Sequence, residues 1–304
     1  MAARIILNET VSPPYFKEVL PMKVGFVGAG KVGCSLGMLF ETTQHNLAGF
    51  YSRTSSSALD AADFTKSKHF QNLETLIKEC DTVFITVPDD AISTVWDSIK
   101  HMSIAGKMIC HCSGSLSSNI FKDIEETGAY GFSIHPLLAV SDRYRSYQEL
   151  PKALFTIEGD AGHIGDIKAL LERSGLKYSV INADVKTRYH GAAVMCSNLV
   201  VALIQAAEDE LRICGFSEEQ LSDAIAPLLT GNVNKVLKVG TQDALTGPIE
   251  RNDVRTVEKH LKTFDGIDRQ VYKTLSLKTL EVAKEKHPES DYSELELLLT
   301  TQED

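Results

Sequence analysis

The sequence predicts an α/β protein in which a doubly wound parallel sheet is followed by an all-α C-terminal domain. Three observations support this. Short β-branched apolar runs alternate with helix-compatible segments up to about residue 182, and a glycine-rich turn joins the first run to a helix. From residue 184 onward, apolar residues recur at helical spacing instead. At 304 residues the chain can hold two domains with cores of their own. We therefore divide it into an N-terminal extension (1–22), a sheet domain (23–183) and a helical domain (184–304).

The composition is that of a globular protein and disfavours several functional classes. Hydrophobic residues make up 43% and charged residues 24%, as in ordinary soluble globular proteins. A net charge of −10 disfavours binding to nucleic acid or to an anionic membrane surface. We find no run of eighteen uninterrupted apolar residues and no signal-peptide core, so we expect no membrane span. Six cysteines without a CxxC pair indicate reduced thiols in a cytoplasmic protein.

The first strand (23–27) runs into a turn and then an apolar helix; the turn reads Gly28-Ala29-Gly30-Lys31-Val32-Gly33. A dinucleotide diphosphate needs a turn without Cβ atoms in its way and free N–H groups at a helix start. Gly28 would make the tight turn, Gly30 would let the backbone approach the phosphates, and Gly33 would let the helix pack on the strand. A strand and a helix flank these glycines, so we predict a dinucleotide site rather than a purely structural turn.

The residues that follow the second strand (47–51) distinguish sites for NAD from sites for NADP. Sites for NAD usually carry an acidic residue here, which accepts hydrogen bonds from the ribose hydroxyls. This chain has Ser52, Arg53 and Thr54 instead. An arginine can bind the 2′-phosphate of NADP through two parallel hydrogen bonds. We therefore predict NADP (NADPH) as the cofactor and NAD as the less favoured one; the alternative is that Arg53 is an ordinary surface residue.

The loops after the next two strands are further candidates for the cofactor crevice, because ligands of doubly wound sheets bind at the carboxyl ends of the strands. Val87, Pro88 and Asp89 follow one strand, and either Asp89 or Asp90 is predicted to cap the helix after it. Ser113 and Gly114 follow the strand 107–112.

That strand also holds the sequence Cys110-His111-Cys112. Alternate strand residues point to opposite faces, so the two sulfurs share a face that His111 does not. We therefore predict buried cysteines and no metal site.

The remaining strands are expected at 130–134, 153–157 and 177–181, with a helix at 162–173 between the last two. Beyond them, residues 189–214 are apolar almost all round a helix, which indicates burial between partners. Ser217 and Gln220 give a capping-box start to the next helix. Further helices are expected from residue 245 or 254 and from residue 269.

Several segments together resemble the superfamily of 6-phosphogluconate dehydrogenase, ketopantoate reductase, pyrroline-5-carboxylate reductase and prephenate dehydrogenase. More narrowly, the chain resembles Rossmann-like proteins with a DUF2520 C-terminal domain. The segments that carry this resemblance are VPDDAI (87–92), HCSGS (111–115), HPL (135–137), YHGAAVMCSN (189–198) and ALTGPIERNDVRTVEKHL (244–261). The resemblance implies a Rossmann dinucleotide-binding domain, a helical domain for substrate binding and dimerisation, and no established substrate. Asn252 stands where the branch usually has glycine.

The resemblance also suggests catalytic residues. In prephenate dehydrogenase a similar His-Pro turn carries a catalytic histidine with a serine upstream of it, and His135 and Ser113 hold those positions here. The alternative is a turn histidine and a helix-capping serine.

In ketopantoate reductase the helix similar to 189–214 carries a lysine and then an asparagine, where this chain has His190 and Asn198. These two lie eight residues apart, on nearly the same face of one helix. A satisfied pair in an interdomain core is the alternative. Val194 lies midway between them, where that enzyme often has asparagine, which disfavours ketopantoate reduction itself. Lys186, one turn earlier, could also reach the cleft, but we expect it to be solvated.

Arg251 follows the Gly247-Pro248 turn and could bind a substrate carboxylate; the alternative is a helix connection with a local Arg–Asp pair and a capping aspartate. These features together predict an NADP-dependent oxidoreductase that acts on a small polar, carboxylate-bearing substrate. A non-catalytic NADP(H)-binding sensor is the second hypothesis. We also expect a homodimer formed through the helical domain.

Overall fold

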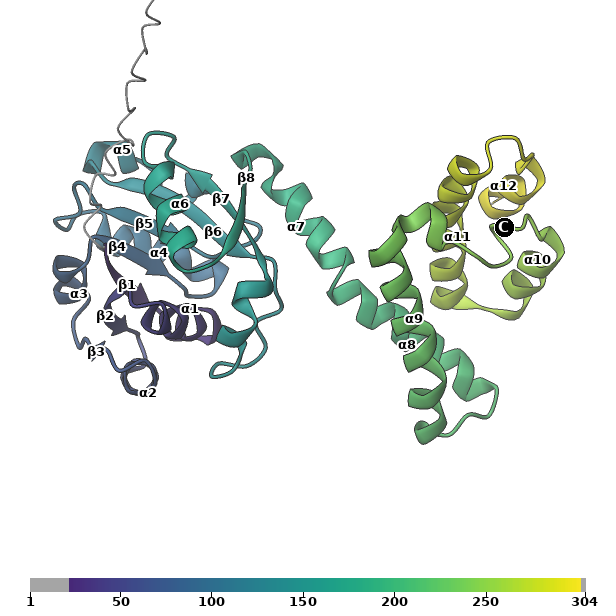
Figure 1. The fold of residues 1–304 in the computed structure, drawn as a ribbon, viewed down its shortest axis with the longest axis horizontal. Coiled ribbons are helices and arrows are strands. Elements are labelled where there is room, and N and C mark those ends of the chain that lie inside the picture. Colours follow the sequence, from purple (N-terminus) through teal and green to yellow (C-terminus); the bar gives the residue numbers. More distant parts are fainter. Residues whose placement is uncertain (1–21, 302–304) are drawn as a thin grey trace, which may run out of the picture. The chain divides into compact units, whose positions relative to one another are not determined.

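The computed structural model describes residues 22–301, so the predicted N-terminal extension lies outside the described residues apart from Met22. The chain separates between Ala193 and Val194 into two compact units, which we call the sheet unit and the helical unit (Figure 1). The sequence pattern changes ten residues earlier, at 183/184, because the first helix after the sheet still belongs to the sheet unit.

Within the described residues, eight strands of the sheet unit form one sheet in the order β3-β2-β1-β4-β5-β6-β7-β8. Neighbouring strands are parallel except β6 and β7, which are antiparallel. The doubly wound α/β class predicted from the sequence is thus confirmed, with one antiparallel pair added. The strands are β1 (Lys23–Val27), β2 (Asn46–Tyr51), β3 (Lys68–His69), β4 (Thr82–Ile85), β5 (Met108–His111), β6 (Tyr130–Pro136), β7 (Leu154–Gly159) and β8 (Lys177–Val180).

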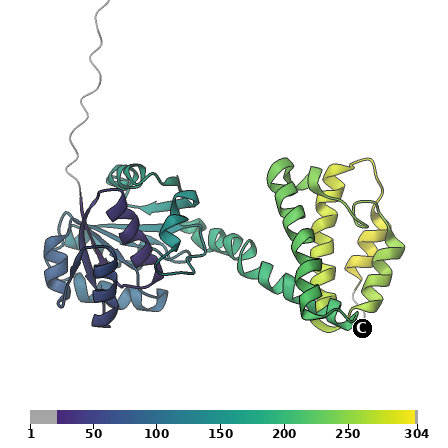
Figure 2. The same ribbon diagram turned by 60° about the horizontal axis from the view of Figure 1, so that its bottom comes forward.

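Helices cover both faces of this sheet (Figures 1 and 2). The α-helices of the sheet unit are α1 (Lys31–Thr42), α2 (Ser55–Phe64), α3 (Leu73–Glu79), α4 (Asp89–Ile99), α5 (Ile124–Thr127) and α6 (Ile164–Arg173), followed by α7 (Lys186–Met195), which crosses the unit boundary. Short 3₁₀ turns occur at η1 (Ser118–Ile120), η2 (Ser146–Gln148), η3 (Leu150–Lys152) and η4 (Ala183–Val185).

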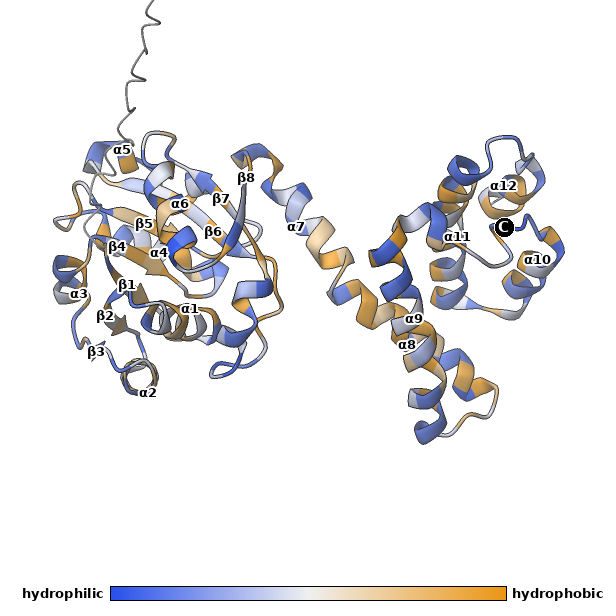
Figure 3. Ribbon diagram, in the orientation of Figure 1, coloured by the Kyte–Doolittle hydropathy of each residue, from blue (hydrophilic) through white to orange (hydrophobic). Residues whose placement is uncertain are grey.

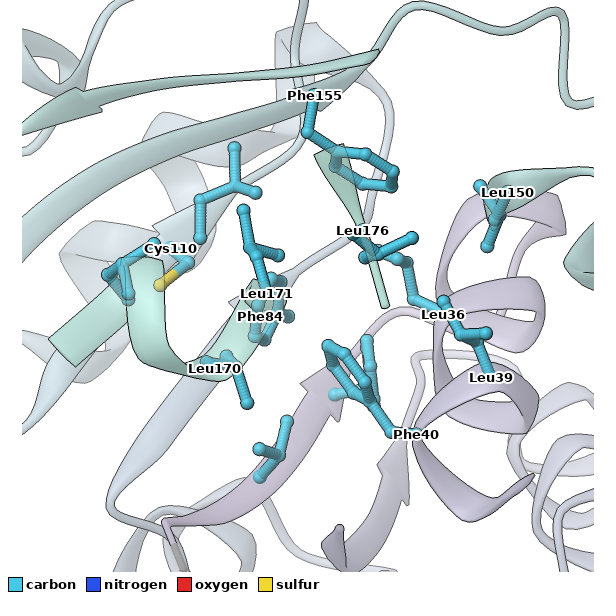
Figure 4. Packing of buried hydrophobic residues seen from close by; sticks show 14 of the residues in the cluster. Leu36, Leu39, Phe40, Phe84, Cys110, Leu150, Phe155, Leu170, Leu171 and Leu176 are labelled. Atoms are coloured by element: carbon cyan, nitrogen blue, oxygen red, sulfur yellow. The ribbon is translucent and has the colours of Figure 1, made fainter. Parts of the chain in front are cut away.

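The strands divide their side chains between two hydrophobic clusters, as the twofold alternation of a strand requires. Phe26 and Phe84 enter the cluster beneath α1, α2 and α6, where their ring centroids lie 5.4 Å apart. Figure 4 shows this cluster, with Phe40 of α1 and Leu170 of α6 reaching toward the strands. Val83 and Ile85 enter the opposite cluster, beneath α3 and α4. Burial on both faces explains the continuous apolar runs in the sequence.

The helical unit has a small core of its own between α10, α11 and α12, formed by Ile249, Val257, Leu261, Leu280, Ala283, Tyr292, Leu295 and Leu299. Its helices are α8 (Asn198–Ile213), α9 (Glu218–Ala244), α10 (Val254–Thr263), α11 (Gly266–Lys286) and α12 (Ser293–Thr300). The capping box at Ser217 and Gln220 is confirmed at the start of α9. Near its end, α9 is interrupted at Gly240, which has a φ of 83°.

The prediction of one continuous helix over residues 189–214 is wrong. Helix α7 ends at Met195 and α8 begins at Asn198, with Ser197 between them at φ −129° and ψ −84°. His190 and Asn198 therefore lie on different helices and not, as predicted, on one face of a single helix.

Helix α8 contains no buried residue in the described structure, although it is rich in apolar side chains (Figure 3). The exposed fraction of Leu199 is 52% and that of Val201 is 68%. The stretch Ala183–Ile213 is long and apolar enough to cross a membrane by length and composition, with a mean hydropathy of 1.5. None of its most apolar window is buried within the protein. Exposed apolar surfaces of this kind are typical of interaction sites.

Candidate functional site

The glycine turn after β1 is packed tightly against the end of β4. Gly28 has a φ of +107°, and a Cβ atom there would lie 2.8 Å from the backbone of Thr86. At Gly33 a Cβ atom would lie 2.3 Å from the Thr86 hydroxyl and 2.8 Å from the Gly28 carbonyl oxygen. The same hydroxyl donates a hydrogen bond to that carbonyl at 2.9 Å. Both positions therefore require glycine, because any side chain would push the turn away from the strand.

Gly30 is different, because the space above it is open. The nearest atom to a Cβ placed there is 3.9 Å away. Gly30 occupies the N-cap position of α1 and supplies no side chain to cap the helix. Uncapped N–H groups facing open space at a helix start suit a diphosphate. The residues present therefore fit a dinucleotide, with Gly28, Gly30 and Gly33 in the arrangement that the sequence predicts. In the same turn Ala29 is buried, Val32 half-buried and Lys31 exposed.

Ser52, Arg53 and Thr54 form the connection from β2 to α2. Ser52 is half-buried, whereas Arg53 and Thr54 are exposed, and Thr54 holds the N-cap position of α2. In the part of the chain that the structure describes, no ion pair engages Arg53. Its guanidinium is thus available to an anion at the carboxyl end of β2, next to a helix N-terminus that also favours negative charge.

The loop after β4 is tied to the loop after β5. Pro88, not an aspartate, occupies the N-cap position of α4, so the predicted aspartate cap is wrong. Asp89 is the first residue of the helix, and its Oδ2 accepts hydrogen bonds from the hydroxyls of Ser113 at 2.7 Å and Ser115 at 3.0 Å. Val87 is half-buried beside it. These bonds fix the relative positions of the two loops.

Ser113 is buried at the centre of this network. Its hydroxyl also accepts the N–H groups of Ser115 at 3.2 Å and Leu116 at 3.0 Å. Its backbone N–H donates to Nδ1 of His111 at 3.2 Å. The Ser113 hydroxyl thus holds the turn that contains Gly114.

Lys186, expected to be solvated, is in fact buried, with only 2% of its surface exposed. Its Nζ donates to the Ser113 carbonyl oxygen at 3.0 Å and to Ser133 Oγ at 2.8 Å. The 3₁₀ turn η4 ends one residue earlier and directs the first residue of α7 toward the sheet. The expectation that Lys186 is solvated is therefore wrong, and the sequence did not single out Ser133.

His135 is the second-last residue of β6 and is hydrogen-bonded through Nδ1 to the Tyr189 hydroxyl at 2.7 Å. The ring of His190 lies edge-on to His135, with centroids 6.2 Å apart. Both histidines converge on Gly114: a Cβ atom there would lie 2.5 Å from His190 Nδ1 and 2.9 Å from His135 Nε2. Glycine at this position is what lets the two rings approach the turn. Tyr189 was also missed, although the spacing 186, 189 and 190 places all three α7 residues on one helical face.

Burial controls the protonation of these groups. Burial, then the charge of Lys186 and then His190, lowers the pKa of His135 to about 4. Burial also lowers the pKa of Lys186 and raises that of the Tyr189 phenol. His135 is therefore a neutral imidazole at neutral pH.

The neighbouring cysteines pack as the strand alternation predicts. Cys110 and Cys112 both join the cluster beneath α1, whereas the buried His111 ring contacts Phe121 of the opposite cluster. Within residues 22–301, no group of three or more His, Cys, Asp and Glu side chains could hold a metal ion.

The other two predicted residues belong to the helical unit. Asn198 is exposed at the start of α8, and its Oδ1 accepts a hydrogen bond from Ser197 Oγ at 3.1 Å. Arg251 is exposed in the connection before α10, where Asp253 caps the helix by accepting the Thr256 N–H at 3.1 Å. The capping aspartate of the alternative interpretation is thus confirmed. Asn252 has a φ of 56°, a left-handed conformation that explains why glycine is usual there.

The fold and the glycine turn define a doubly wound α/β protein of the Rossmann-like class. Residues 15–136 match the family model described as a Rossmann-like domain, and residues 153–279 match the domain of unknown function DUF2520. The chain therefore belongs to the proteins that join a Rossmann-like domain to a DUF2520 domain, as the sequence segments predicted. No curated protein matches the chain.

Solved structures share this architecture. Protein TM1727 from Thermotoga maritima is 29% identical over 87% of this chain and 99% of its own, with a TM-score of 0.71. Protein BF3122 from Bacteroides fragilis, whose name describes it as a candidate NADP oxidoreductase, is 20% identical over 86% of this chain and 98% of its own (TM-score 0.67). A reductive aminase from Aspergillus terreus in complex with NADPH and ethyl levulinate is 16% identical over 90% and 98% (TM-score 0.61). At these identities the last two show the fold alone.

Proposed function

We propose that the protein is an NADP(H)-dependent oxidoreductase that transfers a hydride to or from a small polar, carboxylate-bearing substrate. One observation carries this proposal: Asp89, in the loop beside the glycine turn, accepts the Ser113 hydroxyl at 2.7 Å. That bond joins the proposed cofactor crevice to the turn on which His135 and His190 converge.

The cofactor residues would be the glycine turn at the diphosphate, Arg53 at the 2′-phosphate, and the loops 87–89 and 113–114 near the nicotinamide. A bound nicotinamide would supply or accept the hydride. The preference for NADP over NAD rests on the free guanidinium of Arg53 and on the absence of an acidic residue at 52–54. The neighbours that bind NADPH or are named for NADP share the fold and support the same choice.

The polar residues of the sheet unit would donate or accept the proton that accompanies the hydride. His135 offers Nε2 toward Gly114, while its Nδ1 is held by Tyr189. His190 Nδ1 is buried and has no hydrogen-bond partner among the described residues. A buried nitrogen without a partner is costly, and a substrate oxygen or nitrogen at Gly114 would satisfy it. Asn198 and Arg251 of the helical unit stay predictions as substrate contacts.

The first test is thermal unfolding of the purified protein with NADPH, with NADH and without either. A ligand at 100 times its dissociation constant adds about 2.7 kcal/mol of stability. We expect NADPH to raise the midpoint more than NADH does, and Arg53→Ala to remove that difference. Arg145→Ala, a change of another exposed arginine in the sheet unit, is the matched control. If neither cofactor moves the midpoint, the proposal fails.

Turnover is then measured as loss of NADPH absorbance with aldehydes, 2-oxo acids and ketone–amine pairs. The second candidate function, an NADP(H)-binding sensor without turnover, is favoured by the full engagement of the Ser113 hydroxyl. Tight NADPH binding without oxidation by any substrate class would support the sensor. Oxidation that His135→Gln abolishes, while NADPH binding persists, would support the enzyme.

We also propose that a second copy of the chain covers the exposed face of α8. The helical unit has a cavity of about 750 Å³ lined mainly by apolar side chains of α8, α9 and α11. A lipid bilayer fits this face poorly, because α7 and α8 are broken at Ser197 and α8 carries Glu208, Asp209 and Arg212. The net charge of −10 further disfavours anionic lipid. A homodimer in the cytoplasm satisfies these constraints.

A further inference from the structure

Lys186 is a buried cation whose partners are neutral. Its Nζ donates to the Ser113 carbonyl oxygen and to the Ser133 hydroxyl, and the carboxylates of Glu158 and Asp89 act on it through space without forming an ion pair in the described part of the chain. Lysine is almost never buried to this degree unless it is paired, because an uncompensated ammonium loses its hydration. The cost of burying this charge needs an explanation beyond packing.

The contacts around Lys186 join one face of α7 to one face of β6. Ser133 and His135 are two residues apart, so their side chains leave the strand on the same side. Lys186 and Tyr189 are three apart on the helix and so are neighbours. Lys186 reaches Ser133 at 2.8 Å and Tyr189 reaches His135 at 2.7 Å. The Lys186 ammonium lies 5.5 Å from the centre of the Tyr189 ring.

We propose that Lys186 is a positioning residue: its buried ammonium holds the 113–114 turn and keeps the His135 imidazole neutral, with Nδ1 on Tyr189 and Nε2 free for a ligand. Protonating His135 would place a second positive charge in the same poorly hydrated pocket. The lowered pKa of His135, caused first by burial and then by Lys186, agrees with this geometry.

The charged and titratable groups around His135 offer it no compensating anion. Lys186, Tyr189 and His190 face it from α7, and His111 contributes from β5. Two carboxylates lie near the pocket. Asp89 of α4 already accepts two serine hydroxyls through Oδ2, and Glu158 of β7, which acts on Lys186 through space, accepts from Ser118. A positively charged His135 would therefore have no free counter-ion.

This inference deepens the proposed function, because a neutral imidazole can pass a proton in two coupled steps. When the Nε2 proton moves to the substrate heteroatom, the Tyr189 hydroxyl proton moves to Nδ1. The imidazole stays neutral in its other tautomer, and Tyr189 becomes a phenolate beside the Lys186 ammonium. The starting state returns when a solvent proton reaches Nε2 and the Nδ1 proton moves back to the Tyr189 oxygen. A carbonyl or imine is the class of substrate group that this arrangement would protonate.

The test is a pH titration of histidine ring resonances by NMR on the full chain, with no cofactor and no substrate. Its result is thus independent of whether the protein proves to be an oxidoreductase. His135→Gln identifies the His135 signal. In the wild-type protein, we expect His135 to stay neutral down to about pH 5 and to populate one tautomer. Lys186→Met should raise its midpoint by about 1 unit or more, whereas Lys186→Arg should preserve the low value.

Two further variants separate charge from structure. Lys152→Met removes an exposed lysine elsewhere in the sheet unit and should leave the His135 midpoint unchanged. Tyr189→Phe should change the His135 tautomer ratio without adding or removing a charge. An unperturbed His135 midpoint near 6.5 in the wild type, or equal midpoints in wild type and folded Lys186→Met, would overturn the proposal. If Lys186→Met does not fold, Lys186→Gln is compared with Lys186→Arg in the same way.

Discussion

Asp89 Oδ2 accepts the Ser113 hydroxyl at 2.7 Å, and this bond links the carboxyl ends of the adjacent strands β4 and β5. The glycine turn lies on one side of the link and the His135–Tyr189 pair on the other. Cofactor binding and the arrangement of the polar cluster should therefore respond together when the link is broken.

Replacing Asp89 with alanine should lower both the stability of the fold and the affinity for NADPH. Two serine hydroxyls lose their acceptor, so we expect the free energy of unfolding to fall by about 1–3 kcal/mol and NADPH affinity to fall as well. Urea unfolding and NADPH fluorescence titration measure the two effects. Asp90→Ala, in the same exposed first turn of α4, is the matched control. Unchanged NADPH affinity in Asp89→Ala would show that the two loops are not coupled.

Two glycine substitutions should have different effects, one on the stability of the fold and the other on NADPH affinity. Gly28→Ala puts a Cβ atom 2.8 Å from the Thr86 backbone at a φ of +107°, so we expect a loss of stability of roughly 1–3 kcal/mol. Gly30→Ala meets no atom closer than 3.9 Å and should fold normally, yet bind NADPH at least tenfold more weakly. Thermal unfolding with and without NADPH distinguishes the two. Normal NADPH binding by Gly30→Ala would place the diphosphate elsewhere.

Part of the fold follows from local features of the sequence, and part depends on tertiary contacts. The apolar runs and the turn at Gly28 predicted the doubly wound class and most strands of the sheet, because periodicity and glycine geometry are local properties. Lys186 was expected to be solvated because a lysine at helical spacing normally is, and only the tertiary position of α7 buries it and brings Tyr189 to His135. The break at Ser197 was also invisible, since the apolar pattern continues across it and no proline or glycine marks it.

The buried histidines predict a loss of stability in mild acid. Burial is the largest cause that lowers the pKa of His111 to about 4, while the unfolded chain has the ordinary value of 6.5. Between these values the unfolded state binds more protons, so stability falls as pH decreases through that window. For His111 the complete loss is roughly 3 kcal/mol, and His135 adds to it in the same direction.

Urea unfolding at a series of pH values from 7.5 to about 4 measures this slope. His111→Gln retains an acceptor for the Ser113 N–H and should flatten the slope. Ser55→Ala, beside the surface residue His69, serves as a control that should leave the slope unchanged. A slope that His111→Gln does not alter would assign the acid sensitivity to other groups.

The exposed face of α8 predicts a dimer that a single charge can disrupt. Val201 is 68% exposed on an apolar helix, so Val201→Glu should place an unpaired carboxylate in the interface of two copies. We expect light scattering to show a dimer for the wild type and a monomer for Val201→Glu at micromolar concentration. Leu297→Glu, at 67% exposure on α12, introduces the same charge on another helix of the unit and should remain dimeric. A wild-type monomer, or loss of the dimer in both variants, would contradict the assignment of α8 as the interface. Binding of the wild type to lipid vesicles would instead identify a membrane as the partner of this face.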